Sequence, residues 1–400
     1  MAYLLKQYNS KNELTDLLTS ILKEKEQLEK LSEQLDIKQD RLNQKEQILM
    51  KKEMDLKMQE AELASQILPK GIPPLNPNQK KSEINLNNNV NDFFNKEHAL
   101  PIDKPLNYSI KIPYIGLGTS RIKNIVDVIY NSIRDGLRMI DTAFKYGNEE
   151  DVGKGIKKAL DDGLCKREEL FVIGKVWIAS REDPKKAIKE TLLKLQLTYL
   201  DLYLDHWPSS NNYGDINGTI PQIPVFDFWP KMEALVEEGL TRSIGCSNYN
   251  VQSLLNLLSF CKIKPVANEV EFHPYYYQEN LKKFCDKENI AIIAYYPLAR
   301  GNGARNYIKE HNGEMDLFEE KHVKELAKKY NKTPGQIIIN WEVSQGIISI
   351  PGTSNTKRMS ENLAALDFKM SDEDIKSLNI FGKRLKFCGC RRFFGMNVMA

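Results

Sequence analysis

Short apolar segments alternate with helical segments between about residues 111 and 381, and this alternation restricts the fold more than any other feature. Eight apolar runs have the length and composition of buried strands. They cover residues 116–119, 137–143, 170–177, 200–207, 241–248, 265–273, 290–298 and 348–353. Continuous apolar strands, each followed by a helix, predict a parallel sheet that is covered all round.

The segments between these runs have the pattern of amphipathic helices. They cover residues 124–136, 148–164, 184–197, 228–240, 251–261, 279–289 and 333–346. Thr333 followed by Pro334, and Ser371 followed three residues later by Asp374, are typical helix starts. Eight strand and helix units in about 250 residues favour a closed (β/α)8 TIM barrel. An open, doubly wound sheet is the alternative, but no Gly-x-Gly-x-x-Gly motif follows a predicted strand.

A long helix is expected before the barrel. Residues 11–68 contain neither Gly nor Pro, and an apolar residue recurs every seventh position, at Leu14, Ile21, Leu28, Leu35, Leu42, Leu49, Leu56 and Leu63. This heptad period predicts a coiled coil. The positions four residues further on are mostly polar, so the coil is weak or depends on a partner. Self-association is favoured, a different partner protein comes second, and a lone charged helix third.

The remaining segments are less regular. Residues 69–108 are rich in Pro and Asn, which predicts a flexible linker. The barrel is expected over residues 109–383 and a C-terminal tail over 384–400. The six cysteines are scattered, which fits reduced thiols, and Cys388 and Cys390 are expected to be free because no second ligand pair lies nearby.

The overall charge and hydropathy exclude several classes of partner. A net charge of +3 gives no reason to expect a nucleic acid. No apolar run approaches the ~18 residues of a membrane span, and the N-terminus lacks a secretion pattern. A cytoplasmic location without a membrane contact is therefore expected.

Polar residues with a chemical use stand at the ends of four neighbouring strands. They are Asp141, Lys175, His206 and the pair Ser247 and Asn248, with Tyr146 just beyond the second strand. The C-terminal strand ends of a barrel converge on its mouth, where barrels place their active sites. Each residue alone has a simpler structural explanation, such as a core histidine or a structural ion pair. Their coincidence at one end favours an active site.

Lys175 is the most informative of these residues. It interrupts an apolar strand, where a charge is costly unless it is paired, and Asp141 on the neighbouring strand is the expected partner. A buried ammonium beside a phenol favours the phenolate, so we expect Lys175 to lower the pKa of Tyr146. Tyr146 would then serve as a general acid near neutral pH.

The same residues lie in motifs that resemble the aldo-keto reductase superfamily. The motifs run in order along residues 111–381: IPYIGLGT, IDTAFKYGNEEDVGKGI, FVIGKVW, YLDLYLDHWP, GCSNYN, ANEVEFHPYYYQ, AYYPLARG and IPGTSNTKRMSENL. The resemblance implies a barrel that binds NADPH, with NADH possible, across its mouth without a Rossmann domain. It also implies a catalytic tetrad of Asp141, Tyr146, Lys175 and His206, in which Tyr146 protonates a carbonyl oxygen.

The resemblance further implies a set of cofactor and substrate contacts. The expected cofactor-binding residues are Thr119, Ser247, Asn248, Glu269, Tyr295, Leu298, Arg300, Thr353, Arg358, Glu361 and Asn362. Ser247 and Asn248 match the residues that hold the nicotinamide carboxamide, Tyr295 matches the aromatic that stacks on the ring, and Arg358 is suited to a 2′-phosphate. Ser120 and Trp207, with Trp229, are expected to border the substrate pocket. No metal is expected.

The chain departs from the family pattern at three cofactor positions. Gly352 replaces a frequent lysine, so one phosphate contact is missing. Glu269 replaces a glutamine, and a carboxylate can accept from the carboxamide but cannot donate to it. Tyr296 replaces a small hydroxyl residue. None of the three belongs to the tetrad.

The predicted function is reduction of small aldehydes or ketones to alcohols with NAD(P)H. The alternative is a dinucleotide-binding barrel that acts as a regulatory or docking subunit through its coiled coil. A metal-dependent hydrolase is a distant third, because His206 and His273 are the only histidines on predicted strands and no ligand cluster accompanies them.

Overall fold

The computed structural model describes residues 103–105, 110–209, 222–299, 316–379 and 385–388. The chain divides into two units, Met1–Asn87 and Asn88–Ala400, and all described residues belong to the second. The predicted coiled coil of residues 11–68 lies outside the described residues, as do most of the linker and most of the C-terminal tail.

Eight strands form one parallel sheet, and neighbours in the sheet follow the order of the chain. They are β3 Leu117–Gly118, β4 Met139–Asp141, β5 Phe171–Val176, β6 Leu202–Asp205, β7 Ile244–Ser247, β8 Ala267–Glu271, β9 Ala291–Tyr295 and β10 Ile348–Ser349. The two edges are joined, because Gly116 N donates to Ser349 O (2.9 Å) and Ser349 N donates to Tyr114 O (2.8 Å). All eight strands lie within the predicted runs, which confirms the parallel α/β architecture.

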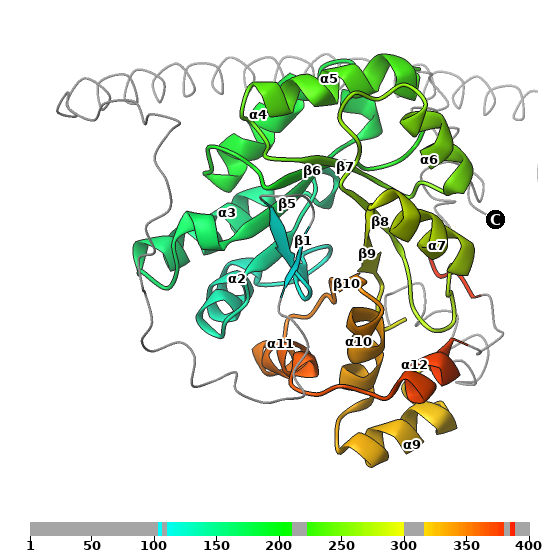
Figure 1. The fold of residues 1–400 in the computed structure, drawn as a ribbon. Helices are drawn as coiled ribbons and strands as arrows, with labels where there is room; N and C mark the ends of the chain where they lie inside the picture. Colours follow the sequence, from blue (N-terminus) through cyan, green and yellow to red (C-terminus); the bar gives the residue numbers. More distant parts are fainter. Residues whose placement is uncertain (1–102, 106–109, 210–221, 300–315, 380–384, 389–400) are drawn as a thin grey trace, which may run out of the picture. The chain divides into compact units, whose positions relative to one another are not determined.

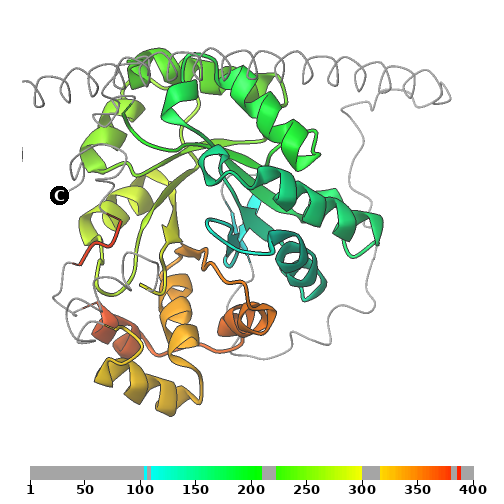
Figure 2. The ribbon, with the colours of Figure 1, turned by 180° about the vertical axis from the view of Figure 1, so that it is seen from behind.

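Helices lie outside the strands in both views (Figures 1 and 2). They are α2 Ile125–Arg134, α3 Glu149–Asp161, α4 Pro184–Leu195, α5 Val225–Glu237, α6 Val251–Leu258, α7 Glu279–Glu288, α9 Lys321–Tyr330, α10 Pro334–Ser344, α11 Thr356–Leu363 and α12 Asp372–Leu378. Short 3-10 helices occur at η3 Phe144–Tyr146, η4 Arg167–Glu169, η5 Ile178–Ser180 and η6 Ala364–Leu366. None of the described helices has the length and apolar character that a bilayer crossing requires.

Both predicted helix starts are confirmed. The Thr333 hydroxyl accepts from Gln336 N and the Gln336 side chain returns the contact, so α10 begins with a capping box. The Ser371 hydroxyl accepts from Asp374 N at the start of α12.

One element falls inside the segment expected to be a linker. Strand β1, Asp103–Pro105, pairs antiparallel with β2, Lys111–Pro113. Residues 103–105, within the segment expected to be a linker, are therefore paired with the first residues of the segment expected to hold the barrel. Ile110 and Ile112 pack against the side chains that fill the barrel.

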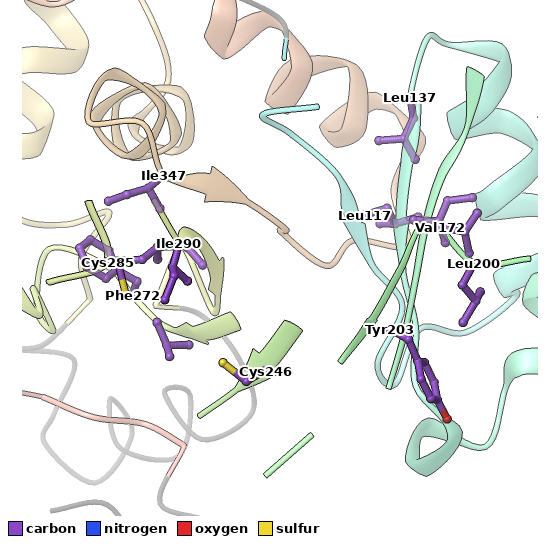
Figure 3. Close-up of a cluster of buried hydrophobic side chains, with 14 of the residues drawn as sticks. Leu117, Leu137, Val172, Leu200, Tyr203, Cys246, Phe272, Cys285, Ile290 and Ile347 are labelled. Carbon is purple, nitrogen blue, oxygen red and sulfur yellow. The ribbon is translucent and has the colours of Figure 1, made fainter. Parts of the chain in front are cut away.

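Strict alternation along each strand divides the core into two clusters. Outward side chains, such as Leu117, Val172 and Cys246, pack under the helices (Figure 3). Inward side chains fill the barrel: Met139, Phe171, Ile173, Leu202, Leu204, Ala267, Ala291, Ile293 and Ile348. Since side chains on a strand alternate with a period of two, the position of each polar residue can be derived from its apolar neighbours.

Candidate active site

The polar residues at the strand ends continue the inward-facing rows. In β5, Phe171 and Ile173 point inward, so Lys175 does too. The same count places further polar residues inside: Asp141 on β4, His206 after β6, Ser247 on β7, Glu269 on β8 and Tyr295 on β9. Because parallel strands share one C-terminal end, these side chains converge there. The structure therefore brings together the predicted tetrad and four of the predicted cofactor residues, including Asn248.

Lys175 is the centre of this cluster. Its Nζ forms an ion pair with Asp141, lies 3.3 Å from Glu269 Oε2, and donates to Tyr146 Oη and Thr142 O, both at 3.2 Å. The ammonium has no exposed surface and the two carboxylates are 2% exposed. The predicted pairing of Lys175 with Asp141 is confirmed.

Tyr146 is held in place by a short turn. It ends η3, where its backbone N–H donates to Ala143 O (3.0 Å), and Gly147 follows in the left-handed conformation at φ 69°. Its ring meets the ring of His206 edge to face, with 6.0 Å between centroids. Tyr146 therefore has the ammonium of Lys175 beside its hydroxyl and the imidazole of His206 beside its ring.

The expected lowering of the Tyr146 pKa is wrong. Burial raises the pKa of Tyr146, and this effect is larger than the lowering caused by the charge of Lys175. The charges of Asp141 and Glu269 raise the pKa further. Although burial alone would lower the pKa of Lys175, the two carboxylates raise it. At neutral pH Tyr146 is a protonated phenol beside a firmly charged ammonium.

His206 is a neutral imidazole among aromatic rings. Burial, assisted by the charges of Lys175 and Lys145, holds the pKa of His206 well below its usual range. The ring of Trp177 meets it edge to face at 5.3 Å, and Trp207 is stacked against it at 6.3 Å. A neutral imidazole can donate one hydrogen bond to a substrate oxygen.

A buried ion pair behind His206 was not identified from the sequence. The guanidinium of Arg181 binds the carboxylate of Asp205 and the carbonyl oxygen of Trp207, and Tyr249 Oη donates to Asp205 (2.6 Å). Arg181 and Asp205 are at most 1% exposed. This network fixes the backbone on both sides of His206. The sequence contained a signal for this ion pair, because Asp205 is a charged residue inside an apolar strand.

Ser247, Asn248 and Tyr295 form one hydrogen-bonded group beside the cluster. Asn248 Nδ2 donates to His206 O (3.0 Å) and to Ser247 Oγ (3.1 Å), and Tyr295 Oη donates to Asn248 Oδ1 (2.8 Å). Ser247 Oγ also donates to Glu269 O (2.8 Å). The amide and hydroxyl groups are thus oriented before any ligand arrives.

Three buried polar atoms at this end of the strands fit a polar ligand. Thr119 Oγ1, His206 Nδ1 and Glu269 Oε2 have no hydrogen-bond partner among the described residues. A buried polar atom without a partner is costly, and a bound carboxamide or carbonyl group is one way to satisfy it. Leu298 is partly buried nearby and packs on both cores, whereas Arg300 lies outside the described residues.

The residues expected at the adenosine end lie in the stretch after β10. Arg358 is exposed on α11 and Asn362 is buried. The Thr353 hydroxyl accepts from Asn355 N (3.1 Å), and the Glu361 carboxylate accepts from Thr333 Oγ1 (2.5 Å). Glu361 therefore also connects α11 to the start of α10.

Two of the expected pocket residues, Ser120 and Trp207, follow the C-terminal ends of strands. Ser120 is exposed after β3, and Trp207 stacks on His206. The prediction that Trp229 borders the pocket is wrong, because its side chain is fully buried in α5 and its Nε1 donates to Ile263 O (3.0 Å). The described residues contain no group of three or more His, Cys, Asp or Glu side chains that could hold a metal ion.

The C-terminal segment is attached to the same end of β8, which sequence reasoning did not find. Phe387 N and Cys388 N donate to the Glu271 carboxylate at 2.6 and 2.7 Å, and Leu385 N donates to Tyr275 O (3.0 Å). His273 Nε2 lies 3.0 Å from the same carboxylate. Residues 385–388 are thus part of the folded domain and not of a free tail.

Comparisons with known proteins agree with this geometry. Residues 115–383 match the model of the aldo/keto reductase family. The chain is 38% identical over 330 residues to aldose reductase C of Dictyostelium discoideum, which covers 78% of the chain and 97% of that protein. It is 34% identical over 301 residues to the NAD(P)H-dependent D-xylose reductase XYR1 of Pyricularia oryzae, with 70% and 93% covered. The aldose reductase structure from Schistosoma japonicum superimposes with a TM-score of 0.66 at 30% identity, covering 74% of this chain and 96% of that one. The chain belongs to the aldo/keto reductase family.

Proposed function

We propose that Tyr146 is the proton donor of a carbonyl reduction and that Asp141, Lys175 and His206 hold and assist it. The chain is an NAD(P)H-dependent oxidoreductase that reduces aldehydes or ketones to alcohols, as its family membership implies. The observation that carries the assignment of residues is the contact of Lys175 Nζ with Tyr146 Oη at 3.2 Å, beside the buried Asp141.

The roles follow from charge and protonation. When bound, the reduced dinucleotide supplies the hydride. Tyr146 is protonated because burial raises its pKa, so its O–H can donate to the carbonyl oxygen and transfer the proton as negative charge develops there. Lys175 stabilises the phenolate that remains, and its own charge is secured by Asp141. His206, which is neutral, orients the carbonyl oxygen through its N–H.

The cofactor residues extend this proposal across the mouth. Ser247 and Asn248 would hold the nicotinamide carboxamide, and Tyr295 would present its ring to the nicotinamide, in support of which Tyr295 is already tied to Asn248. Thr119, Leu298 and Arg300 would follow towards the pyrophosphate. The adenosine end would be held by Thr353, Arg358, Glu361 and Asn362, with the exposed guanidinium of Arg358 available to a 2′-phosphate.

We also propose a coiled coil for residues 11–68 that joins two copies of the chain. The support is the heptad period of the sequence. Self-association would leave the reductase site of each copy complete, because all tetrad residues come from one barrel.

The proposed reaction can be tested by following the transferred hydrogen. The protein is mixed with 4-nitrobenzaldehyde and NADPH that carries deuterium on C4 of the nicotinamide, and the alcohol is analysed by mass spectrometry. Deuterium on the carbinol carbon supports hydride transfer. Tight NADPH binding with no labelled alcohol from any of a panel of aldehydes and ketones would favour a regulatory or docking subunit instead.

A further inference from the structure

Lys175 contacts two carboxyl groups, one more than the proposed tetrad contains. Asp141 and Glu269 are both 2% exposed, and Lys175, which touches both, has no exposed surface. Two ionised carboxylates beside one ammonium would leave a net negative charge in a buried site, which is strongly unfavourable. A proton shared between the carboxyl groups removes that charge.

The contacts with Lys175 distinguish the two carboxyl groups. The two carboxyl groups are hydrogen-bonded to each other, an interaction that raises the pKa of Glu269 and lowers that of Asp141. A hydrogen bond between carboxyl groups needs one proton. Asp141 is the closer ion-pair partner of Lys175, whereas Glu269 Oε2 lies 3.3 Å from Lys175 Nζ, so the proton belongs on Glu269.

We propose that Glu269 is a positioning residue that works as a neutral carboxylic acid. It donates its proton to Asp141, so that Lys175 balances one full negative charge and keeps its hydrogen bond to Tyr146. The inference rests on the proposed role of Tyr146. When Glu269 ionises, its proton passes to solvent and a second carboxylate competes with Tyr146 for Lys175.

The neighbouring groups set the direction of the pH dependence. Burial, together with the charge of Asp141, raises the pKa of Glu269 to about 8, against the opposing effect of Lys175. Burial raises the pKa of Tyr146 and lowers that of His206, so these two titrate above and below Glu269. The titratable or charged groups at this end of the strands include Asp141, Tyr146, Lys145, Lys175, Asp205 and His206. An ionised Glu269 raises the pKa of Tyr146 further, which makes the phenol a weaker acid.

The kinetic test compares pH profiles of the full chain and of Glu269→Gln, which carries a fixed neutral group of nearly the same shape. With NADPH and 4-nitrobenzaldehyde, the ratio of kcat for Glu269→Gln to kcat for the unchanged protein should rise about tenfold between about pH 7 and about pH 9, because the protonated fraction of a group with this pKa falls by that factor. Glu271→Gln is the matched control, two positions along β8. It should keep the original pH profile, because Glu271 contacts backbone N–H groups of the C-terminal segment.

A second readout detects the proton itself without cofactor or substrate. The infrared difference spectrum between the unchanged protein and Glu269→Gln should contain the C=O band of a protonated carboxylic acid at neutral pH, and this band should disappear as pH rises through about 8. Glu342 and Asp205, whose pKa values burial also raises, are common to both proteins and cancel.

Parallel pH profiles, or an infrared difference without the acid band, would overturn the role of Glu269. Absence of turnover in both proteins at every pH would instead contradict the proposed function, and the infrared band would still decide whether the pair of Asp141 and Glu269 carries a proton.

Discussion

At the scale of single residues, one buried ammonium organises the site. Lys175 contacts Asp141, Glu269, Tyr146 and the carbonyl oxygen of Thr142, and it has no exposed surface. A charge so placed is stable only with its partners, and removing one member of a buried pair leaves the other uncompensated. A second substitution that removes the charge of Asp141 therefore separates the structural role of Lys175 from its chemical role.

Lys175→Met should lose about 3–5 kcal/mol in the free energy of unfolding, because Asp141 remains buried without its cation. The double variant Asp141→Asn with Lys175→Met should regain most of this loss in a urea titration, since Glu269 can then stay protonated beside a neutral amide. Activity should be lost in both variants. Equal stability of the single and double variants would show that Asp141 does not depend on Lys175.

The residue scale also shows where sequence reasoning fails. The pairing of Lys175 with Asp141 follows from a charge inside an apolar strand, and it is confirmed. The net pKa direction of Tyr146 could not be derived in the same way, because it depends on burial and on Glu269, which is distant in the sequence. Trp229 was misplaced because a tryptophan on an amphipathic helix has the same local pattern whether it faces a pocket or the core.

At the scale of elements, glycines set how closely helices approach. Gly153 in α3 faces the end of α4, where a Cβ on this residue would lie 2.7 Å from Leu195 Cα. Real Cβ atoms do not approach backbone that closely, so α3 and α4 pack backbone against backbone at this point. Leu192 and Leu195 of α4 are consequently buried.

Gly153→Ala should therefore destabilise the barrel by about 1–3 kcal/mol, because the helices must separate. Gly335→Ala in α10 is the matched control, since its new Cβ would meet Phe318 at an ordinary 3.4 Å. The control should stay within about 1 kcal/mol of the unchanged protein. Thermal unfolding of both variants distinguishes them, and equal midpoints would refute the close packing.

The helices and strands that the sequence predicted correctly are those with a clear pattern of apolar residues. All eight barrel strands and seven helices, together with the start of α12, were expected where they occur, since periodic segments carry most of the signal. Strands β1 and β2 were missed because they form a short antiparallel pair outside the repeating pattern of strands and helices. The attachment of residues 385–388 could not be predicted, because its acceptor, Glu271, lies more than a hundred positions away.

At the scale of the whole molecule, a reductase barrel is joined to a segment with heptad periodicity. The family match covers residues 115–383, so residues 11–68 lie outside it. The barrel holds the complete tetrad, and catalysis is therefore not expected to require association.

Light scattering tests the proposed coiled coil. The full chain should have the mass of a dimer at micromolar concentration, whereas a chain that lacks residues 11–68 should be a monomer with unchanged kcat for 4-nitrobenzaldehyde. A monomeric full chain would refute self-association and leave a different partner protein, or a lone charged helix, as the remaining alternatives for this segment.

The central claim, that Tyr146 donates the proton, is tested most directly by a single turnover of Tyr146→Phe. The variant keeps the ring and loses only the hydroxyl that Lys175 contacts at 3.2 Å. Rapid mixing of enzyme and NADPH with excess 4-nitrobenzaldehyde should show hydride transfer slowed by about 10²–10⁴-fold, while the Kd for NADPH, measured by fluorescence, stays within about twofold. A variant that transfers hydride as fast as the unchanged protein would contradict the assignment.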